Sequence, residues 1–189
     1  AVETYKYNFI NQKKFKEVVE SRDIRDQNVK NELYEYVKDK KVDVIVGGFP
    51  CQGFSMAGNR IVEDPRNSLY LDMLKIVEKL EPKILIMENV EGILSMLNGK
   101  IVEKIINDFK KIGYDITYKL LNAADYGVPQ TRKRVIFIGN RLGLENYHPM
   151  PIYEESEYKT LGETIEKYMN MEENKEINLD KNPLIRPVL

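Results

Sequence analysis

The sequence contains one cysteine and one histidine among its 189 residues. A single cysteine cannot form an internal disulfide, which fits a reducing compartment. Cys51 and His148 cannot supply the four ligands of a closed zinc site, so we expect no metal. Apolar runs are too short to span a bilayer, and the N-terminus lacks a signal-peptide pattern. These absences predict a cytoplasmic protein without a membrane partner.

The chain also has almost no net charge, because 29 basic residues face 30 acidic ones. If nucleic acid is a partner, positive charge must therefore gather on one face of the protein. The cluster Arg132–Arg134 is the strongest candidate, since Lys13–Lys16 and Lys38–Lys41 are typical of solvated helix ends. The hydrophobic content of 42% predicts a globular domain with a real core.

The only cysteine follows a strongly apolar stretch, Val42–Val46, which predicts a buried strand. Ligands and reactive groups collect at the carboxyl ends of strands in open α/β sheets, and Cys51 falls at such an end. A lone cysteine is most often a small buried hydrophobe. The neighbouring Gly47, Gly48 and Pro50 favour a reactive thiol instead, because they build a tight turn that lets a ligand approach the backbone.

Strand-like and helix-like patterns alternate along the rest of the chain, which predicts the α/β class. The expected strands, besides the one before Cys51, are Phe15–Glu20, Lys83–Glu88, Tyr114–Leu121 and Val135–Ile138. The expected helices are Asp26–Asp39, Arg66–Leu80, Gly92–Leu97, Ile101–Ile112 and Tyr158–Met169. The intervening segment Gln52–Asn67 is a long polar loop, which is typical of a functional or disordered segment.

Glu88 ends the second apolar strand, and we expect it to be buried among aliphatic residues. Burial disfavours the charged form, so we expect a raised pKa suited to holding or donating a proton. Capping of the next turn is the simpler alternative for this residue. Arg132 and Arg134 alternate as the chain enters the last strand, so we expect both side chains on one side. Two guanidiniums on one face require carboxylate, phosphate or carbonyl partners, and Glu88 is the partner that we expect.

Three blocks carry a resemblance to a known family: Gly48–Gln52 (GFPCQ), Glu88–Val90 (ENV) and Gln130–Arg134 (QTRKR). In order and spacing they resemble the signature blocks of the DNA cytosine 5-methyltransferases, and the match extends to about Tyr168. The resemblance implies a Rossmann-like methyltransferase fold with a mostly parallel sheet and helices on both faces. It also implies methyl transfer from S-adenosylmethionine to ring carbon 5 of a flipped-out cytosine in duplex DNA, leaving S-adenosylhomocysteine.

The resemblance assigns roles to individual residues. The residues assigned to catalysis are Cys51, as the nucleophile, and Glu88, Arg132 and Arg134. Those assigned to binding the cofactor are Asp23, Ile24, Pro50 and Leu69. Those assigned to binding DNA are Gln52, Ser55, Arg60 and Asn89. Simpler alternatives stay open for four kinds of position. Asp23 fits a helix cap or Asx turn equally well, Leu69 fits core packing, Ser55 and Arg60 fit a solvated loop, and Asn89 fits a residue that holds the turn.

The resemblance also indicates what the chain does not contain. A Gly-rich cofactor loop and a target-recognition domain are expected in the family, and neither pattern is found. We therefore divide the chain into a partial catalytic domain, 1–150, and a segment, 151–189, that would lead toward the recognition domain. We expect weak or no activity from the chain alone, with complementation by a further segment or subunit. The expected setting is a prokaryotic cytoplasm, near the nucleoid, in restriction–modification or in gene regulation.

Two other functions fit the same residues. A cytosine in RNA, such as transfer RNA, would present much the same ring to the pocket. A non-catalytic α/β binding module would leave Cys51 inert. Covalent trapping by duplex DNA that contains 5-fluorocytosine separates a catalytic thiol from an inert one.

Overall fold

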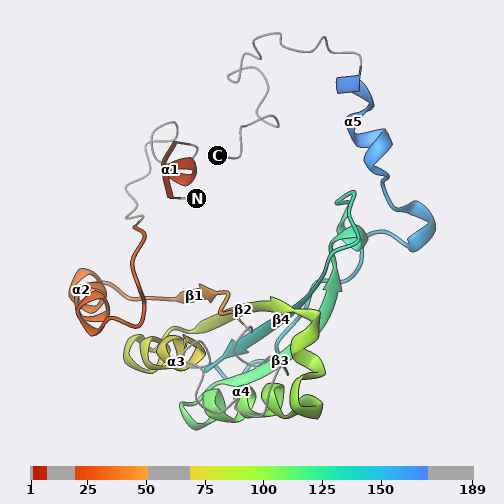
Figure 1. Cartoon of the computed structure of the whole chain (residues 1–189). Coiled ribbons are helices and arrows are strands. Elements are labelled where there is room, and N and C mark those ends of the chain that lie inside the picture. The colour runs from red at the N-terminus through yellow and green to blue at the C-terminus, as the bar shows by residue number, and fades with distance from the viewer. Residues whose placement is uncertain (1, 8–19, 51–68, 170–189) are drawn as a thin grey trace. The chain divides into compact units, whose positions relative to one another are not determined.

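The computed structural model describes residues 2–7, 20–50 and 69–169, with the side chains of 167–169 excepted (Figure 1). Their helices are α1 (Val2–Tyr5), α2 (Gln27–Val37), α3 (Leu69–Leu80), α4 (Lys100–Lys111) and α5 (Leu161–Met169). The strands are β1 (Val44–Gly47), β2 (Ile84–Val90), β3 (Asp115–Asn122) and β4 (Lys133–Asn140). Single 3₁₀ turns occupy Glu91–Leu94, Met96–Gly99, Ala123–Tyr126 and Glu155–Glu157. The expected strand Phe15–Glu20 lies almost wholly outside the described residues.

Internal contacts divide the chain into two compact units. The first contains residues 1–121 and 134–149, and the second contains 122–133 and 150–189. The division expected after residue 150, into a catalytic part and a segment toward a recognition domain, stays a prediction. The loop 122–133, which carries Arg132, groups with the C-terminal segment instead of with the first unit.

The described strands form one sheet in the order β1-β2-β4-β3. β1 and β2 run parallel, with Gly47 opposite Met87. β2 and β4 run antiparallel, with Met87 opposite Phe137 and Val90 opposite Arg134. The α/β class is thus confirmed. A mostly parallel sheet was expected. The described sheet is mixed, because β4 pairs with β2 in the antiparallel direction.

Helices α3 and α4 pack on one face of this sheet, as Figure 1 shows. The core side chains alternate along the strands, with Leu85 and Met87 from β2 and Val135 and Phe137 from β4. Val77 of α3 and Phe109 of α4 are packed into the same cluster. Burying such side chains contributes about 1.5–3 kcal/mol each, so this layer is a substantial source of stability.

The opposite face of the sheet is apolar but partly uncovered. Val44 and Val46 of β1 are 47% and 71% exposed. Their neighbours on this face, by the strand register, are Ile84 and Ile86, and all four are aliphatic. Helices on both faces were expected, but among the described residues α3 and α4 cover one face alone. An exposed aliphatic surface on a sheet marks a place where further polypeptide can pack.

Residue Asp108, on α4, is a buried carboxylate with three donors. Lys104 and Lys111 approach its oxygens at 2.7 and 2.8 Å, and the Tyr70 hydroxyl donates to it at 3.1 Å. Burial opposes the charge, but the hydrogen bonds from these donors outweigh it and lower the pKa of Asp108 to about 2. The carboxylate therefore ties α4 to α3 in its charged form.

We predict that Asp108→Asn lowers the free energy of unfolding at pH 7 by about 2 kcal/mol. A depressed pKa stabilises the fold above the unfolded value near 4, and this stabilisation is lost as the pH falls toward 2. Urea unfolding between pH 7 and pH 2 measures both effects. Glu103→Gln, an exposed carboxylate on the same helix, is the control. Equal pH profiles for Asp108→Asn and the wild-type chain would contradict the assignment.

Candidate active site

The carboxyl ends of β1 and β2 meet at one edge of the sheet, because the two strands are parallel and in register at Gly47 and Met87. The next residues are Gly48 and Glu88. A Cβ atom placed on Gly48 would lie 3.2 Å from Oε2 of Glu88. The absence of a side chain at Gly48 thus leaves room for the Glu88 carboxylate beside the backbone that leads, three residues later, to Cys51.

The segment before Cys51 is fixed to β2 by Asn89. Its side-chain amide donates to the carbonyl oxygen of Phe49 at 2.8 Å, and its Oδ1 accepts from the amide of Val90 at 2.9 Å. The Phe49 ring is buried and lies 6.1 Å from the ring of Tyr70. Asn89 therefore holds the turn, which was the simpler of its two interpretations. A role in binding substrate stays a prediction for this buried residue.

Glu88 and Arg134 form an ion pair across β2 and β4, with Nε of Arg134 2.8 Å from Oε1 of Glu88. The distance between Nε and Oε1 is that of a close ion pair, but the angle at the N–H of Nε does not meet the geometry of a hydrogen bond. The expected pairing of a carboxylate with Arg134 is thus present. The expectation that aliphatic residues bury Glu88 is wrong, since its side chain is 46% exposed. It points to the uncovered face of the sheet, where no described helix shields it.

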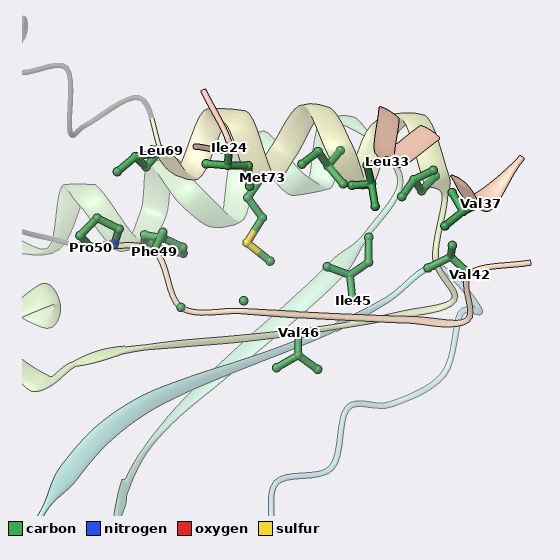
Figure 2. Close-up of a pocket in the computed structure, with 14 residues that line it drawn as sticks. Ile24, Leu33, Val37, Val42, Ile45, Val46, Phe49, Pro50, Leu69 and Met73 are labelled. Atoms are coloured by element: carbon green, nitrogen blue, oxygen red, sulfur yellow. The ribbon is translucent and has the colours of Figure 1, made fainter. Parts of the chain in front are cut away.

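A cavity of about 380 Å³ runs along β1, between this strand and the helices α2 and α3. Figure 2 shows Pro50 and Phe49 at one end of it, with Leu69 and Ile24 nearby and Leu33 and Val37 farther along. Three of the four residues expected near the cofactor, Ile24, Pro50 and Leu69, therefore line one cavity. Its walls are apolar side chains and glycine backbone.

Asp23 sits just before the cavity wall, in the loop that precedes α2. Its Oδ1 accepts from the backbone amide of Arg25 at 2.9 Å, and the Arg25 guanidinium contacts both carboxylate oxygens. These hydrogen bonds lower the pKa of Asp23 to about 2. The residue therefore forms an Asx turn, while Asp26 caps α2 by accepting from the amide of Asn28. A further hydrogen bond from Asp23 to an exocyclic amino group stays a prediction.

Several expected site residues are not placed by the structure. Cys51, Gln52, Ser55 and Arg60 lie outside the described residues. Arg132 is described, but in the second unit. Its backbone amide donates to Oδ1 of Asn122 at 3.1 Å, and its carbonyl accepts from the amide of Ala123. Its expected contact with Glu88 or a phosphate stays a prediction.

One feature of the site region was not foreseen from the sequence. Lys30 of α2 and Asp72 of α3 form a buried ion pair with a separation of 2.8 Å. Each lies on the apolar stripe of its helix, Lys30 three residues before Leu33 and Asp72 three residues after Leu69. Opposite charges on two core-facing stripes are the signal that could have revealed it, because charged residues are almost never buried unless paired.

Metal binding and membrane insertion find no support in the described residues. Among them, no group of three or more acidic, histidine or cysteine side chains is placed to hold a metal ion. None of the helices in that part of the chain combines the length and apolar character needed to cross a bilayer.

The structure thus combines an α/β fold with an ion-paired carboxylate at the carboxyl end of β2, an edge where ligands commonly bind in open α/β sheets. The sequence profile of the family described as C-5 cytosine-specific DNA methylase matches residues 1–184. The chain belongs to this family.

Individual relatives agree with that assignment. The chain is 43% identical over 136 residues to the Type II methyltransferase M1.HphI of Haemophilus parahaemolyticus, covering 70% of this chain and 36% of the relative. It is 36% identical over 167 residues to the Type II methyltransferase M.BspRI of Lysinibacillus sphaericus, covering 84% and 38%. A crystal structure described as a prophage-encoded DNA modification methyltransferase from E. coli matches with a TM-score of 0.58 and 32% identity, covering 74% and 37%. The chain thus spans little more than a third of these relatives.

Proposed function

We propose that this chain carries catalytic residues for methyl transfer from S-adenosylmethionine to ring carbon 5 of a cytosine in duplex DNA. The observation that carries the proposal is the Glu88–Arg134 ion pair, placed beside the backbone that leads to Cys51. Membership of the family and the names of its type II relatives support the substrate class. A place in a restriction–modification system within a prokaryotic cytoplasm, close to the nucleoid, is part of the same proposal.

The thiolate of Cys51 would act first, because carbon 5 of cytosine is a poor nucleophile while the ring stays aromatic. A bond from sulfur to carbon 6 breaks the conjugation and makes carbon 5 enamine-like. The electron pair shifts toward N3 and the carbonyl oxygen. Glu88 would hold the proton or hydrogen bond at N3, and the Arg134 guanidinium would stabilise the carbonyl oxygen. Arg132 would orient Glu88 or contact a phosphate.

Bound S-adenosylmethionine would supply a methyl group on a positively charged sulfur, which carbon 5 can attack. Ile24, Pro50 and Leu69 would hold its adenine between apolar walls, and Asp23 would accept from the exocyclic amino group. A base then removes the proton from carbon 5, the bond between carbon 6 and the Cys51 sulfur breaks, and the thiolate leaves. Because this chemistry needs both ring faces, the cytosine must be flipped out of the stack. Gln52, Ser55 and Arg60 would contact the DNA.

Methyl transfer from labelled S-adenosylmethionine, read out as 5-methylcytosine in duplex DNA, tests the proposal. We expect transfer to DNA in the presence of a tenfold excess of transfer RNA as competitor. Label that moves to the RNA instead would reassign the substrate. The absence of 5-methylcytosine from an assembly that binds both DNA and cofactor would support a binding module and overturn the enzyme.

We further propose that the uncovered sheet face and the edge strand β1 receive polypeptide that completes the methyltransferase, in the same chain or a second one. Val44 and Val46 expose aliphatic surface there, and among the described strands β1 pairs on one side only. We expect the chain by itself to be weakly active or inactive and to gain activity with a completing segment from a relative. Full turnover by the isolated chain would contradict this part.

Gly48→Ala tests whether the Glu88 carboxylate must stay beside the turn. The new Cβ would lie 3.2 Å from Oε2, so the carboxylate would have to shift by a small fraction of its length, and we expect kcat to fall by up to about 10-fold because small misplacements of a positioned group are costly. Gly92→Ala is the matched control, since a Cβ there would meet no atom within 4 Å. Unchanged kcat in Gly48→Ala would show that the position of the carboxylate is not critical.

A further inference from the structure

The ion pair between Lys30 and Asp72 is costly to bury. The two side chains are 3% and 8% exposed, and Nζ of Lys30 lies 2.8 Å from Oδ1 of Asp72. Taking both charges out of water costs about as much as their attraction returns, so apolar residues of similar size would often serve stability equally well. Stability alone therefore does not explain why this position holds an ion pair.

A second contact of Lys30 indicates that role. Its ammonium also donates to the backbone carbonyl of Arg25 at 3.3 Å. One lysine thus links α3, through Asp72, to the loop that precedes α2. This loop contains Asp23 and Ile24, and its amides are held internally, with the Asp26 amide donating to the carbonyl of Asp23 at 3.1 Å.

Both linked elements contribute side chains to the cavity along β1 (Figure 2). Ile24 comes from the loop, and Leu69 comes from the first turn of α3, one helical turn before Asp72. Both line the cavity together with Phe49 and Pro50. The Lys30 ammonium therefore ties the loop that carries Ile24 to the helix that carries Leu69.

We propose that Lys30 and Asp72 are positioning residues that hold the loop of Ile24 against α3 at the adenine site, so that they control cofactor affinity and not the methyl-transfer step. The inference rests on the proposed function, in which this cavity binds the adenine of S-adenosylmethionine. Other charges near the pair do not replace it. Lys75 lies 3.7 Å from Oδ1 of Asp72 but is exposed, and the Arg25 guanidinium is engaged by Asp23.

The test compares variants that separate stability from positioning. Lys30→Met alone leaves the Asp72 carboxylate buried without its ammonium. The double variant Lys30→Met with Asp72→Val removes both charges and restores an apolar match, so it is expected to regain the thermal stability of the wild type. It cannot regain the bond to the Arg25 carbonyl, because methionine has no donor. Lys75→Met, which removes the exposed neighbour of the same carboxylate, is the control.

Hydrogen exchange on the 189-residue chain gives the first readout. In the double variant we expect the amides of residues 23–26 to exchange at least about 5-fold faster, while those of β2 and α4 are unchanged. Equal exchange in residues 23–26 would overturn the positioning role. This readout requires neither cofactor nor catalysis, so it stands even if the proposed function fails.

Binding of S-adenosylhomocysteine to the completed enzyme gives the second readout. We expect the double variant to bind it about 5- to 10-fold more weakly, in line with the loss of one partly buried hydrogen bond. KM for S-adenosylmethionine should rise by a similar factor while kcat stays the same. Faster exchange in residues 23–26 with unchanged affinity would overturn the link to the cofactor. A wild-type enzyme that does not bind S-adenosylhomocysteine would overturn the proposed function itself.

Discussion

Replacing Cys51 with serine is expected to lower kcat for cytosine methylation by at least about 10⁴-fold, because the proposed reaction depends on a covalent bond from its sulfur to ring carbon 6. A hydroxyl at ordinary pKa is far less ionised than a thiol and cannot replace it at neutral pH. Methyl transfer by the completed enzyme, measured under single-turnover conditions, isolates this step from product release.

Two further measurements make the Cys51→Ser result specific. The temperature of unfolding and the affinity for duplex DNA should both match the wild type, since serine differs from cysteine by one atom. A variant that keeps a tenth of the wild-type kcat would exclude Cys51 as the nucleophile. A variant that loses stability as well as activity would assign a packing role to the thiol.

Replacing Glu88 with glutamine is expected to lower kcat about 10²- to 10³-fold, because in the proposed mechanism the charge that develops on the pyrimidine would lose its partner at N3. Arg134→Met should have an effect of similar size, since it removes the guanidinium and leaves Glu88 without the contact at 2.8 Å. KM for DNA should change little in both variants, because most affinity for DNA comes from phosphate contacts.

The two residues should also act as a unit. The double variant is expected to lose less activity than the product of the single losses, because contacting residues show coupling of about 0.5–3 kcal/mol. The ion pair between Glu81 and Arg141 is a matched control, with a separation of 3.0 Å at the other ends of β2 and β4. Glu81→Gln should leave kcat unchanged. Additive losses for Glu88 and Arg134 would contradict a shared role.

The local elements were largely predictable from residue patterns. The stripe Val29–Leu33–Val37 predicted a helix over Asp26–Asp39, and the structure has α2 at Gln27–Val37 with Asp26 as its cap. The apolar run Lys83–Glu88 predicted a strand, and β2 spans Ile84–Val90. Periodicity fixes the kind of element well, while its ends depend on contacts that lie elsewhere in the chain.

The surroundings of Glu88 could not be predicted in the same way. A continuous apolar run is typical of a strand covered on both faces, and this led to the expectation that Glu88 is buried. The described helices cover only the face that carries Leu85 and Met87. Whether the second face is covered depends on segments far from β2 in sequence, and the run of β2 residues carries no information about them.

The sequence alone does not decide the role of Asp23, for a different reason. Asp23 can serve as an Asx turn and as an acceptor for a ligand, because a carboxylate has several lone pairs. The structure shows the turn with Arg25 and leaves the ligand as a proposal. The pairing of Lys30 with Asp72 required knowledge that α2 and α3 pack together, which no local pattern supplies.

The proposed mechanism requires Cys51, Glu88 and Arg134 to address three different atoms of one extruded cytosine. The most direct test incubates the completed enzyme with cofactor and duplex DNA that carries 5-fluorocytosine at the target base. Because fluorine cannot leave as a proton does, the reaction should stop at a covalent adduct, and mass spectrometry should map the DNA to the peptide containing Cys51. An adduct on another residue, or none from an enzyme that binds both DNA and cofactor, would contradict the account.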